Sequence, residues 1–365
     1  MKFSQLFFRN NFFAKDNQSL DLVDLMRKAC FIHQDGSGVF SMLQLGLRLQ
    51  RRIETVVREE MEAIGFGEMQ LSLLQDTQLW EQTQRIDSYG QELFQLKDRK
   101  GHGWCLGATA EELITNVVKT HYQNADMNLC VYQVGNKYRD ELRARAGLIR
   151  AKQFVMKDAY SFCTSAEALD EGYKEVRGAY ERIFQRLGLA YSIVASDSGE
   201  IGGSFSEEFV VESEFGEEVD GKKLLEVGHI FKLGQTYSEK MGLKDNLQQF
   251  VHMGCYGIGI SRLLMALCEQ RRDAKGFWGD DAFATFDVVI CALDFHRNEA
   301  VKARAQALYA ELRGQGLQVL LDDRNETTGK KLSDSEIVCA KRRVLVSQRA
   351  IDAGELEWSE RRQDT

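Results

Sequence analysis

MGCYGIGISRLLMAL, residues 253–267, places three glycines in front of an apolar helix whose first turn carries Arg262. Glycine allows a backbone to approach a ligand closely, a helix N-terminus attracts anions, and the arginine fork matches phosphate oxygens. The same letters also fit a tight strand-to-helix turn with a solvated arginine. The stretch therefore predicts either a nucleotide site or a purely structural turn.

Two common phosphate loops do not match this stretch. Its glycines follow the order G-x-x-G-x-G, whereas dinucleotide-binding folds use G-x-G-x-x-G within a βαβ unit, and no clear second strand follows before Asp280. The chain also lacks the G-x-x-x-x-G-K-[ST] pattern of a P-loop. A nucleotide site at this position would have to be of another kind.

The composition is typical of a soluble globular protein. The 365 residues suffice for two or three domains, and 44% of them are hydrophobic and 28% charged. No apolar run is long enough for a membrane span, and the amino-terminal region lacks the continuous apolar core of a signal peptide. The net charge of −8 argues against a generally basic nucleic-acid-binding surface, so RNA contacts would need local basic patches.

The cysteines and histidines indicate the compartment. None of the eight cysteines forms a C-x-x-C pair, and the six histidines do not lie near them at zinc-ligand spacing. We therefore expect reduced thiols, a cytoplasmic protein and no zinc site.

The sequence contains no proline, although average usage of about 5% would give roughly 18 in a chain of this length. Chance does not produce such a chain, which indicates extreme selection or deliberate redesign. Because proline restricts the unfolded chain, its absence should cost some stability.

Hydrophobic periodicity predicts a first domain rich in antiparallel strands. Residues 46–65 repeat at helical spacing and predict an amphipathic helix. Residues 104–122 predict a strand, a turn at Gly107 and a helix capped near Thr109, with Glu111 and Glu112 in the first turn, where acids complement the helix dipole. The other predicted elements are strands at 69–75, 128–142 and the end of 143–162, a helix at 165–188, and strands at 207–213 and 224–234 separated by a short acidic hairpin.

From Phe286 onward the pattern alternates between strand and helix. Strands are predicted at 286–293, 317–323 and 342–348, with a helix at 298–316, and this alternation indicates an α/β domain. Because glycines and acids cluster at 272–285, we expect one domain over 1–280 and a second over 285–365.

Several of these segments together resemble one family, the prolyl-tRNA synthetases of the bacterial or mitochondrial kind, which are class II aminoacyl-tRNA synthetases. The similarity runs nearly end to end and is specific through the order and spacing of its motifs. It is strongest in KYRDELRARAGLIRAKQFVMKDAYSF (137–162), IGGSFSEEF (201–209), EVGHIFKLGQTYS (226–238), MGCYGIGISR (253–262) and VLLDDRNE (319–326).

The resemblance implies an architecture. The first domain would be an α+β catalytic domain with a mixed, mostly antiparallel sheet, and its three class II motifs would lie near 36–65, 131–160 and 250–267. The second would be an α/β anticodon-binding domain. The family's large editing insertion between the second and third motifs is absent from this chain, and a homodimer is expected.

The resemblance also implies a proline pocket. Thr109 and Glu111, from GATAEE, would hold the imino nitrogen of proline. Phe231 would lie near the proline ring, and Cys255 and Gly257 would line the pocket.

An ATP site is implied by the second and third motifs. Arg139 would hold the α-phosphate and the proline carboxylate, and Glu141 would contact the adenine amino group. Phe154 would stack on adenine with Arg150 nearby, and Arg262 would bind the γ-phosphate. The stretch quoted at the start would then form a class II ATP site.

Further contacts are implied outside these motifs. Glu226 would serve ATP and Mg²⁺, and His229 would also contact ATP. In the second domain, Arg324, Lys330 and Lys331 would contact the anticodon of tRNA(Pro).

The implied reaction is ATP-dependent activation of proline followed by transfer to the 3′ end of tRNA(Pro). The proline carboxylate would attack the α-phosphate in line, giving prolyl-adenylate and pyrophosphate, and catalysis would come from positioning and charge stabilisation by Arg139, Arg262 and Mg²⁺. No side-chain nucleophile is required.

Departures from the family pattern coincide with missing prolines. Gln44, Ala108 and Gly279 stand where the family usually has proline, Ala110 occupies the middle of the T-x-E loop, and Gln153 replaces an acid that contacts adenine. These positions favour the hypothesis of an engineered, proline-free variant. Two alternatives remain at this level: a class II synthetase for another amino acid such as threonine, and a catalytically weakened tRNA-binding paralogue.

Overall fold

The computed structural model describes residues 1–8, 20–123, 125 and 127–360. The chain divides into two compact units, a larger one of Gly36–Phe40 and Glu54–Ala266, and a smaller one of Met1–Asp35, Ser41–Ile53 and Leu267–Thr365. This division differs from the linear boundary predicted near residue 280, because the amino-terminal segments group with the carboxyl-terminal domain. Gln44, at the first motif, begins helix α2 (Gln44–Ala63), and its Oε1 accepts a hydrogen bond from the amide of Phe7 at 3.0 Å.

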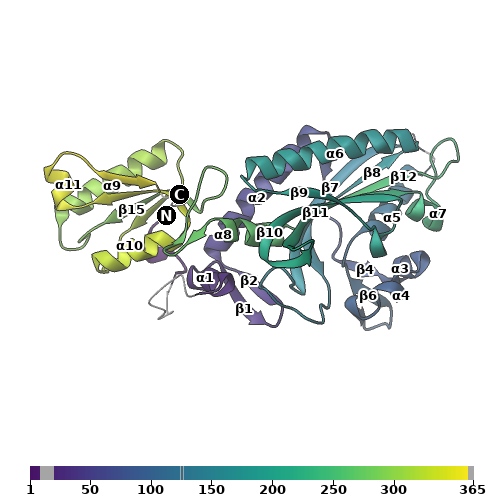
Figure 1. Cartoon of the computed structure of the whole chain (residues 1–365), viewed down its shortest axis with the longest axis horizontal. Helices are drawn as coiled ribbons and strands as arrows, with labels where there is room; N and C mark the ends of the chain where they lie inside the picture. The colour runs from purple at the N-terminus through teal and green to yellow at the C-terminus, as the bar shows by residue number, and fades with distance from the viewer. Residues whose placement is uncertain (9–19, 124, 126, 361–365) are drawn as a thin grey trace. The chain divides into compact units, whose positions relative to one another are not determined.

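The larger unit is built on a seven-stranded sheet (Figure 1). Only β3 and β7 pair in parallel, and the other neighbours are antiparallel, which confirms the predicted mixed, mostly antiparallel sheet. In spatial order the strands are β3 (Gly67–Glu68), β7 (Asn128–Tyr138), β8 (Gln153–Cys163), β12 (His252–Ile258), β11 (Lys222–Gly234), β10 (Phe205–Val219) and β9 (Ser192–Ser196).

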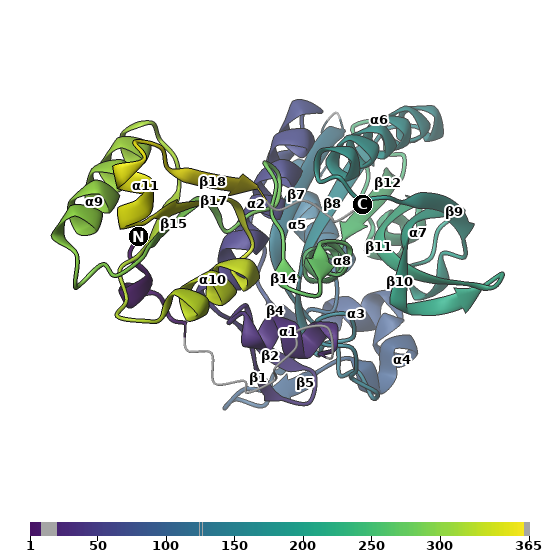
Figure 2. The same ribbon diagram turned by 60° about the vertical axis from the view of Figure 1, so that its left-hand side comes forward.

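Strand alternation gives the sheet two different faces. Helix α6 (Ala166–Arg186) lies across one face, over β8, β11 and β12, as Figure 2 shows. Odd-numbered residues of β8 point toward this helix, since the Lys157 ammonium donates to the Tyr180 hydroxyl of α6. Even-numbered residues of β8, such as Phe154 and Asp158, therefore face the opposite side.

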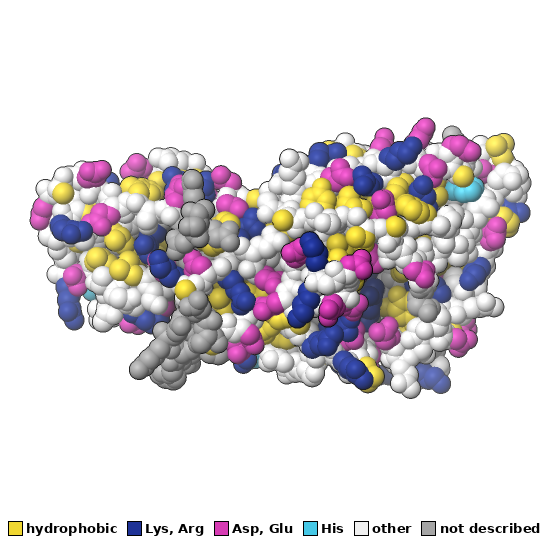
Figure 3. Space-filling model, viewed as in Figure 1, with side chains coloured by type: hydrophobic (Ala, Val, Ile, Leu, Met, Phe, Trp, Pro, Cys, Tyr) yellow, Lys and Arg dark blue, Asp and Glu magenta, His cyan; other side chains and the backbone are white. Residues whose placement is uncertain are grey.

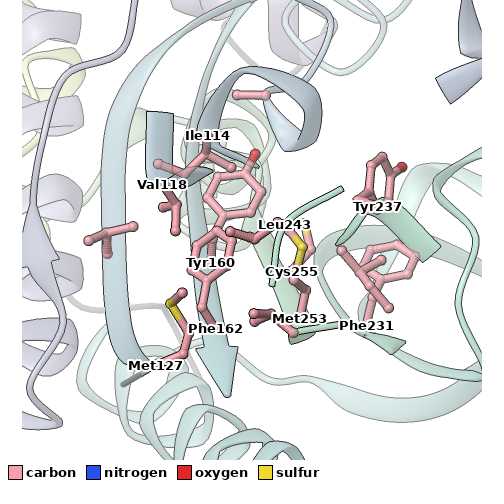
Figure 4. Close-up of a cluster of buried hydrophobic side chains, with 14 residues drawn as sticks. Ile114, Val118, Met127, Tyr160, Phe162, Phe231, Tyr237, Leu243, Met253 and Cys255 are labelled. Carbon is pink, nitrogen blue, oxygen red and sulfur yellow. The ribbon is translucent and has the colours of Figure 1, made fainter. Parts of the chain in front are cut away.

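The opposite face carries a buried apolar cluster (Figure 4). Ile114 and Val118 of α5 (Glu111–Tyr122) pack there beside Tyr160 and Phe162 of β8. Helix α7 (Thr236–Met241) adds Tyr237. The cluster thus fixes the start of α5 against the sheet, which is where the site described below begins.

A small three-stranded sheet adjoins these helices within the larger unit. Its order is β4 (Leu74–Asp76), β6 (Gly103–Leu106) and β5 (Gln95–Lys97), accompanied by α3 (Thr77–Thr83), α4 (Arg85–Tyr89) and the 3₁₀ turn η2 (Gly90–Glu92). The predicted strand at 69–75 was mostly wrong, because only its last two residues belong to β4. The preceding segment makes isolated bonds instead, for example from the Met69 amide to the Tyr132 carbonyl at 2.8 Å.

Strands β10 and β11 are longer than predicted. The acidic segment EFGEEV continues β10 through an irregularity between Glu212 and Glu217, and the strands turn at Asp220 and Gly221, whose φ values are 50° and 77°. A two-residue connection with positive φ at both positions matches the right-handed twist of a hairpin. The described hairpin therefore leaves no inserted domain between these strands.

The smaller unit confirms the predicted β-α-β alternation. Its sheet has the order β16 (Val319–Asp322), β15 (Phe286–Ala292), β17 (Ala340–Val346) and β18 (Glu357–Glu360), and only β18 is antiparallel to its neighbour. Helices α9 (Glu299–Gly314) and α10 (Thr328–Ile337) lie on opposite faces, and α11 (Gln348–Asp352) packs beside α9 (Figure 2). The remaining elements are η1 (Phe3–Gln5), α1 (Leu22–Lys28), β1 (Ile32–Gly36), β2 (Val39–Met42), η3 (Gly199–Ile201), α8 (Ile260–Gln270), β13 (Arg272–Asp273) and β14 (Gly276–Phe277).

Candidate active site

A cavity of about 360 Å³ lies in the larger unit, on the side of the sheet opposite α6. Strand register builds its floor, because Asp158, Gly257 and His229 form one row across β8, β12 and β11. The cavity collects every predicted site residue of the first domain: Thr109, Glu111, Arg139, Glu141, Arg150, Phe154, Glu226, His229, Phe231, Cys255, Gly257 and Arg262.

One end of the cavity is a buried carboxylate. Glu111 is 0% exposed as a residue, and the Thr109 hydroxyl donates to its two oxygens at 2.7 and 2.6 Å. The Cys255 thiol donates to Glu111 Oε1 at 3.2 Å. Burial alone would raise the pKa of Glu111, but the guanidinium of Arg85, 3.1 Å away, and the Thr109 hydroxyl outweigh it and lower the pKa. This end can therefore hold a cationic nitrogen.

Helix α5 begins one residue later than predicted, so the Thr109 hydroxyl does not cap the helix and can contact Glu111. Ala110, not Thr109, is the N-cap of α5, and it offers no side-chain cap. Gln75 holds the loop instead, donating from Nε2 to the Thr109 carbonyl at 2.9 Å. A Cβ at Gly107 would lie 2.3 Å from that nitrogen, so only glycine lets Gln75 approach.

The cavity is also lined by two arginines. Arg139 follows β7, and its buried Nε has no hydrogen-bond partner among the described residues. Its guanidinium lies 5.3 Å from the ring centre of Phe154. Arg262, in the first turn of α8, donates to the Glu226 carboxylate at 2.9 Å and to the Ile149 carbonyl at 3.1 Å. A buried, unsatisfied arginine nitrogen beside an aromatic ring suits an anionic, planar ligand.

Glu226 and His229 line the cavity beside Arg262. Glu226 Oε1 lies 3.3 Å from His229 Nδ1, while Oε2 faces Arg262. Burial would raise the pKa of Glu226, but His229 and Arg262 outweigh it and lower the pKa to about 2. The His229 ring stacks on Phe231 with 3.8 Å between ring centres, and His229 Nε2 is buried without a partner in the described part of the chain.

Gly254 and Gly257 of the third motif are required for different reasons. A Cβ at Gly254 would lie 2.0 Å from the Tyr256 hydroxyl on the α6 side, so packing requires this glycine. A Cβ at Gly257 would meet nothing closer than 3.8 Å, and it would protrude into the cavity. Packing therefore does not explain Gly257, whereas ligand space does.

Two predicted adenine contacts lie at the rim. Arg150 lines the cavity and forms an ion pair with Glu217 of β10, and Glu141 lines it from the loop after β7. Arg150 is therefore engaged by a carboxylate of the hairpin.

Comparisons with known proteins follow the same division. A family model described as the class II core domain of tRNA synthetases (G, H, P, S and T) matches residues 94–271, and one described as an anticodon binding domain matches 287–365. Curated proline–tRNA ligases of Anaplasma phagocytophilum and Rhizobium etli are 35% and 32% identical to this chain, and the alignments cover 94% and 93% of it and 93% and 90% of those proteins. The chain belongs to the proline–tRNA ligase family.

Solved structures confirm the class II fold. A prolyl-tRNA synthetase of Giardia lamblia in complex with prolyl-adenylate has a TM-score of 0.83 at 19% identity, covering 93% of this chain and 71% of that one. One of Cryptosporidium parvum, complexed with halofuginone and AMPPNP, also scores 0.83, at 17% identity, and covers 94% and 73%. The family ligase of Burkholderia multivorans, 27% identical, aligns over 528 positions, more than the 365 residues here, so it carries segments with no counterpart in this chain.

The predicted anticodon residues lie in a charged network of the smaller unit. Arg324 donates to Asp322 and, at 2.8 Å, to Asp334, and Lys330 forms an ion pair with Asp334. Lys331 is 1% exposed and donates to the Ala292 and Asp322 carbonyls, at 2.7 and 3.2 Å. This burial differs from the expectation of an RNA contact, because the ammonium is engaged in holding the backbone.

Several site features had no signal in the sequence pattern. Glu112 lies in the first turn of α5 as predicted, but the sequence pattern did not indicate that it is 0% exposed. Arg85, which pairs with both acids, comes from a segment without hydrophobic periodicity. Asp158, at the cavity floor, accepts from Gln133 at 2.8 Å and could have been suspected only as an acid inside an apolar strand.

Two searches of the described residues found nothing. No group of three or more His, Cys, Asp or Glu side chains there could hold a metal ion. None of the helices there is both long and apolar enough to cross a membrane. On the face seen in Figure 3, Lys and Arg side chains are interspersed with Asp and Glu.

Proposed function

We propose that the cavity activates proline with ATP and that the chain then charges tRNA(Pro). The observation that carries this proposal is that Glu111 and Arg139 line one cavity, so that a buried carboxylate and an unsatisfied guanidinium nitrogen are available to one ligand. An imino acid has a cationic nitrogen and a carboxylate, and this pair complements both.

The residues would divide the work as follows. Thr109 and Glu111 bind the imino nitrogen, and the proline ring lies against Phe231, Cys255 and the bare backbone of Gly257. Arg139 orients the carboxylate toward the α-phosphate, so that attack occurs in line. The support is geometric, since these groups surround one cavity.

ATP would lie against Arg139 and Arg262. Phe154 stacks on adenine, with Glu141 and Arg150 at its rim. Arg262 neutralises the γ-phosphate, and Arg139 stabilises charge that develops on the α-phosphate. His229, whose Nε2 has no partner among the described residues, donates or accepts one further hydrogen bond to the nucleotide.

A magnesium ion fits one carboxylate of this site. Glu226 is held ionised by Arg262 and His229, and Mg²⁺ is commonly bound by one or two carboxylates together with substrate phosphates. When bound, the ion would neutralise phosphate charge. The reaction needs no zinc and no side-chain nucleophile.

Assignments beyond the catalytic cavity are proposals of the same kind. Residues 1–280 would form the catalytic part and 285–365 would bind the anticodon. Lys330 retains a partly exposed side chain for RNA, whereas Arg324 and Lys331 would act by holding Asp322. We also propose a cytoplasmic homodimer, which light scattering coupled to gel filtration would test.

ATP–pyrophosphate exchange tests the catalytic proposal. The assay compares proline, alanine, cysteine and threonine, on wild type and on Arg139→Ala. Exchange driven mainly by proline and abolished by the substitution is the expected result. Exchange driven best by threonine, or no exchange from folded protein, would contradict it and favour one of the two alternative classes named above.

A further inference from the structure

A buried cluster of three charges lies behind the proline end of the cavity. Arg85 begins α4, and its Nη1 donates to Glu111 Oε2 at 3.1 Å and to Glu112 Oε1 at 2.9 Å. The arginine side chain is 7% exposed, and both glutamate side chains are 0% exposed. Glu111 lines the cavity, whereas Arg85 and Glu112 do not.

The cluster holds more negative than positive charge. Among the described residues, Arg85 is the only cation that forms an ion pair with either glutamate. The aromatic rings of Trp80, Tyr89 and Tyr237 surround its guanidinium, with centres 5.2, 5.1 and 5.4 Å away. Because these rings exclude water, two ionised carboxylates would share one guanidinium at low dielectric.

Two neighbouring acids in such a place do not ionise equally. Burial raises the pKa of Glu112, and Glu111 adds to the rise, although Arg85 opposes it. The pKa of Glu111 is lowered, because Arg85 and the Thr109 hydroxyl outweigh its burial. Glu111 is therefore the more acidic of the two carboxyls and the cavity side stays anionic, although the Thr83 hydroxyl donates to Glu112 at 2.8 Å and opposes the rise of the Glu112 pKa.

We propose that Arg85 is a positioning residue for proline recognition, which keeps Glu111 ionised and aimed into the cavity by donating to its Oε2. The cluster thereby selects a substrate with a cationic nitrogen. This inference rests on the proposed role of Glu111 and deepens it. Arg85 acts only through Glu111, since it does not reach the cavity.

The shape of the contact favours arginine over lysine. A single guanidinium nitrogen contacts both glutamates while the flat group lies among three rings, and an ammonium offers neither the breadth nor the stacking. Arg85→Lys should keep the charge and restore only part of the function that Arg85→Met loses.

The test compares Arg85→Met, Arg85→Lys and Glu112→Gln. The matched control is Arg271→Met, since Arg271 is 2% exposed, forms an ion pair with Asp280 at 2.9 Å, packs against aromatic rings and does not line the cavity. KM for proline, KM for ATP and kcat are measured by pyrophosphate exchange from pH 6 to 9, and proline affinity is measured by calorimetry.

Arg85→Met is expected to raise KM for proline about 100-fold at pH 7, with KM for ATP within about twofold of wild type. Without Arg85 the pKa of Glu111 rises, so KM for proline should fall about tenfold per pH unit as pH increases toward that pKa. Glu112→Gln should raise KM for proline much less than Arg85→Met does, because Glu111 keeps its guanidinium partner. Arg271→Met should lower the melting temperature and leave both KM values unchanged.

Equal effects of Arg85→Met on both KM values, or a pH profile like that of wild type, would reduce Arg85 to a packing role and overturn the proposal. A loss in Glu112→Gln as large as in Arg85→Met would place the working charge on Glu112. If Arg85→Met does not fold, a wild-type proline KM and pH profile in Arg85→Lys overturns the proposal. Absence of exchange in wild type would defeat the proposed function, and calorimetry would still decide the role of Arg85.

Discussion

Lys157→Met should stabilise this protein at acidic pH and lose that advantage as pH rises. Lys157 is 0% exposed on the α6 face of β8, where its ammonium donates to the Tyr180 hydroxyl and to the Tyr256 carbonyl at 3.0 Å. No described carboxylate forms an ion pair with it. Burial therefore lowers the pKa of Lys157 from its ordinary 10.5 to about 7.

The size of the effect follows from this pKa. Holding the ammonium in the folded state below pH 7 costs about 5 kcal/mol relative to the unfolded chain, at 1.36 kcal/mol per pKa unit. Between pH 7 and 10.5 the unfolded chain binds more protons, so wild-type stability rises with pH by about 1.4 kcal/mol per unit. Methionine removes this cost but leaves the Tyr256 carbonyl without its donor, which costs about 2 kcal/mol. The net gain should be about 3 kcal/mol at pH 6 and about zero near pH 9.

Urea unfolding at pH 6, 7.5 and 9, followed by tryptophan fluorescence, measures this difference. Lys137→Met is the control, because Lys137 is also buried but forms an ion pair with Asp158 at 2.7 Å. Its loss should destabilise the protein by about 3 kcal/mol at all three pH values. A Lys157→Met variant that is equally destabilised at pH 6 and pH 9 would refute the argument.

Four other substitutions separate structural from ligand-binding roles. Gly254→Ala should destabilise the fold by about 1–3 kcal/mol, because its Cβ would lie 2.0 Å from the Tyr256 hydroxyl. Gly257→Ala should melt like wild type and raise KM for proline at least tenfold. Equal effects of the two substitutions on melting temperature and KM would contradict this contrast. Glu226→Gln should raise KM for ATP without changing KM for proline, and it should flatten acid unfolding, because the lowered pKa of Glu226 gives stability that is present above pH 4.5 and lost toward about pH 2. Gly279→Pro should lower the melting temperature, because a Cβ there would lie 2.9 Å from Ala284 Cβ. A higher melting temperature would instead show that this backbone accepts the proline that the family usually has at this position.

The periodicity of hydrophobic residues along the chain predicted much of the fold. Alternation found β7 and β8, and three-to-four spacing found α2, α6 and α9, because one buried face per element leaves a repeating pattern. The same reasoning predicted a strand shorter than β10, since residues 217–219 are exposed and two of them are acidic, yet they pair with β11. It also predicted a strand over 69–75, which was mostly wrong, because Leu73 and Leu74 are exposed and do not pack into the core.

The site was predictable where a motif bears its chemistry and obscure where chemistry depends on distant partners. Arg139 and Arg262 stood out through their motifs, and the structure brings both to one cavity. Glu111 and Glu112 are identical in the sequence pattern of a first helical turn, yet one faces the cavity and the other does not. Both pair with Arg85, 26 and 27 residues earlier, and no local pattern encodes that pairing. Their other donors differ, because Thr109 and Cys255 donate to Glu111 whereas Thr83 donates to Glu112.

The two-residue turn at Asp220 and Gly221 has a consequence for engineering. Adjacent antiparallel strands end about 5 Å apart, so a guest domain whose own ends are equally close could be spliced there without altering strand register. Both residues are exposed, and neither lines the cavity. The Burkholderia relative shows that this family accommodates additional segments. The hairpin tip is thus a suitable insertion point for a reporter, a binding module or a switchable domain. Movement of such a domain would act through β10 on Glu217, which pairs with Arg150 at the cavity rim.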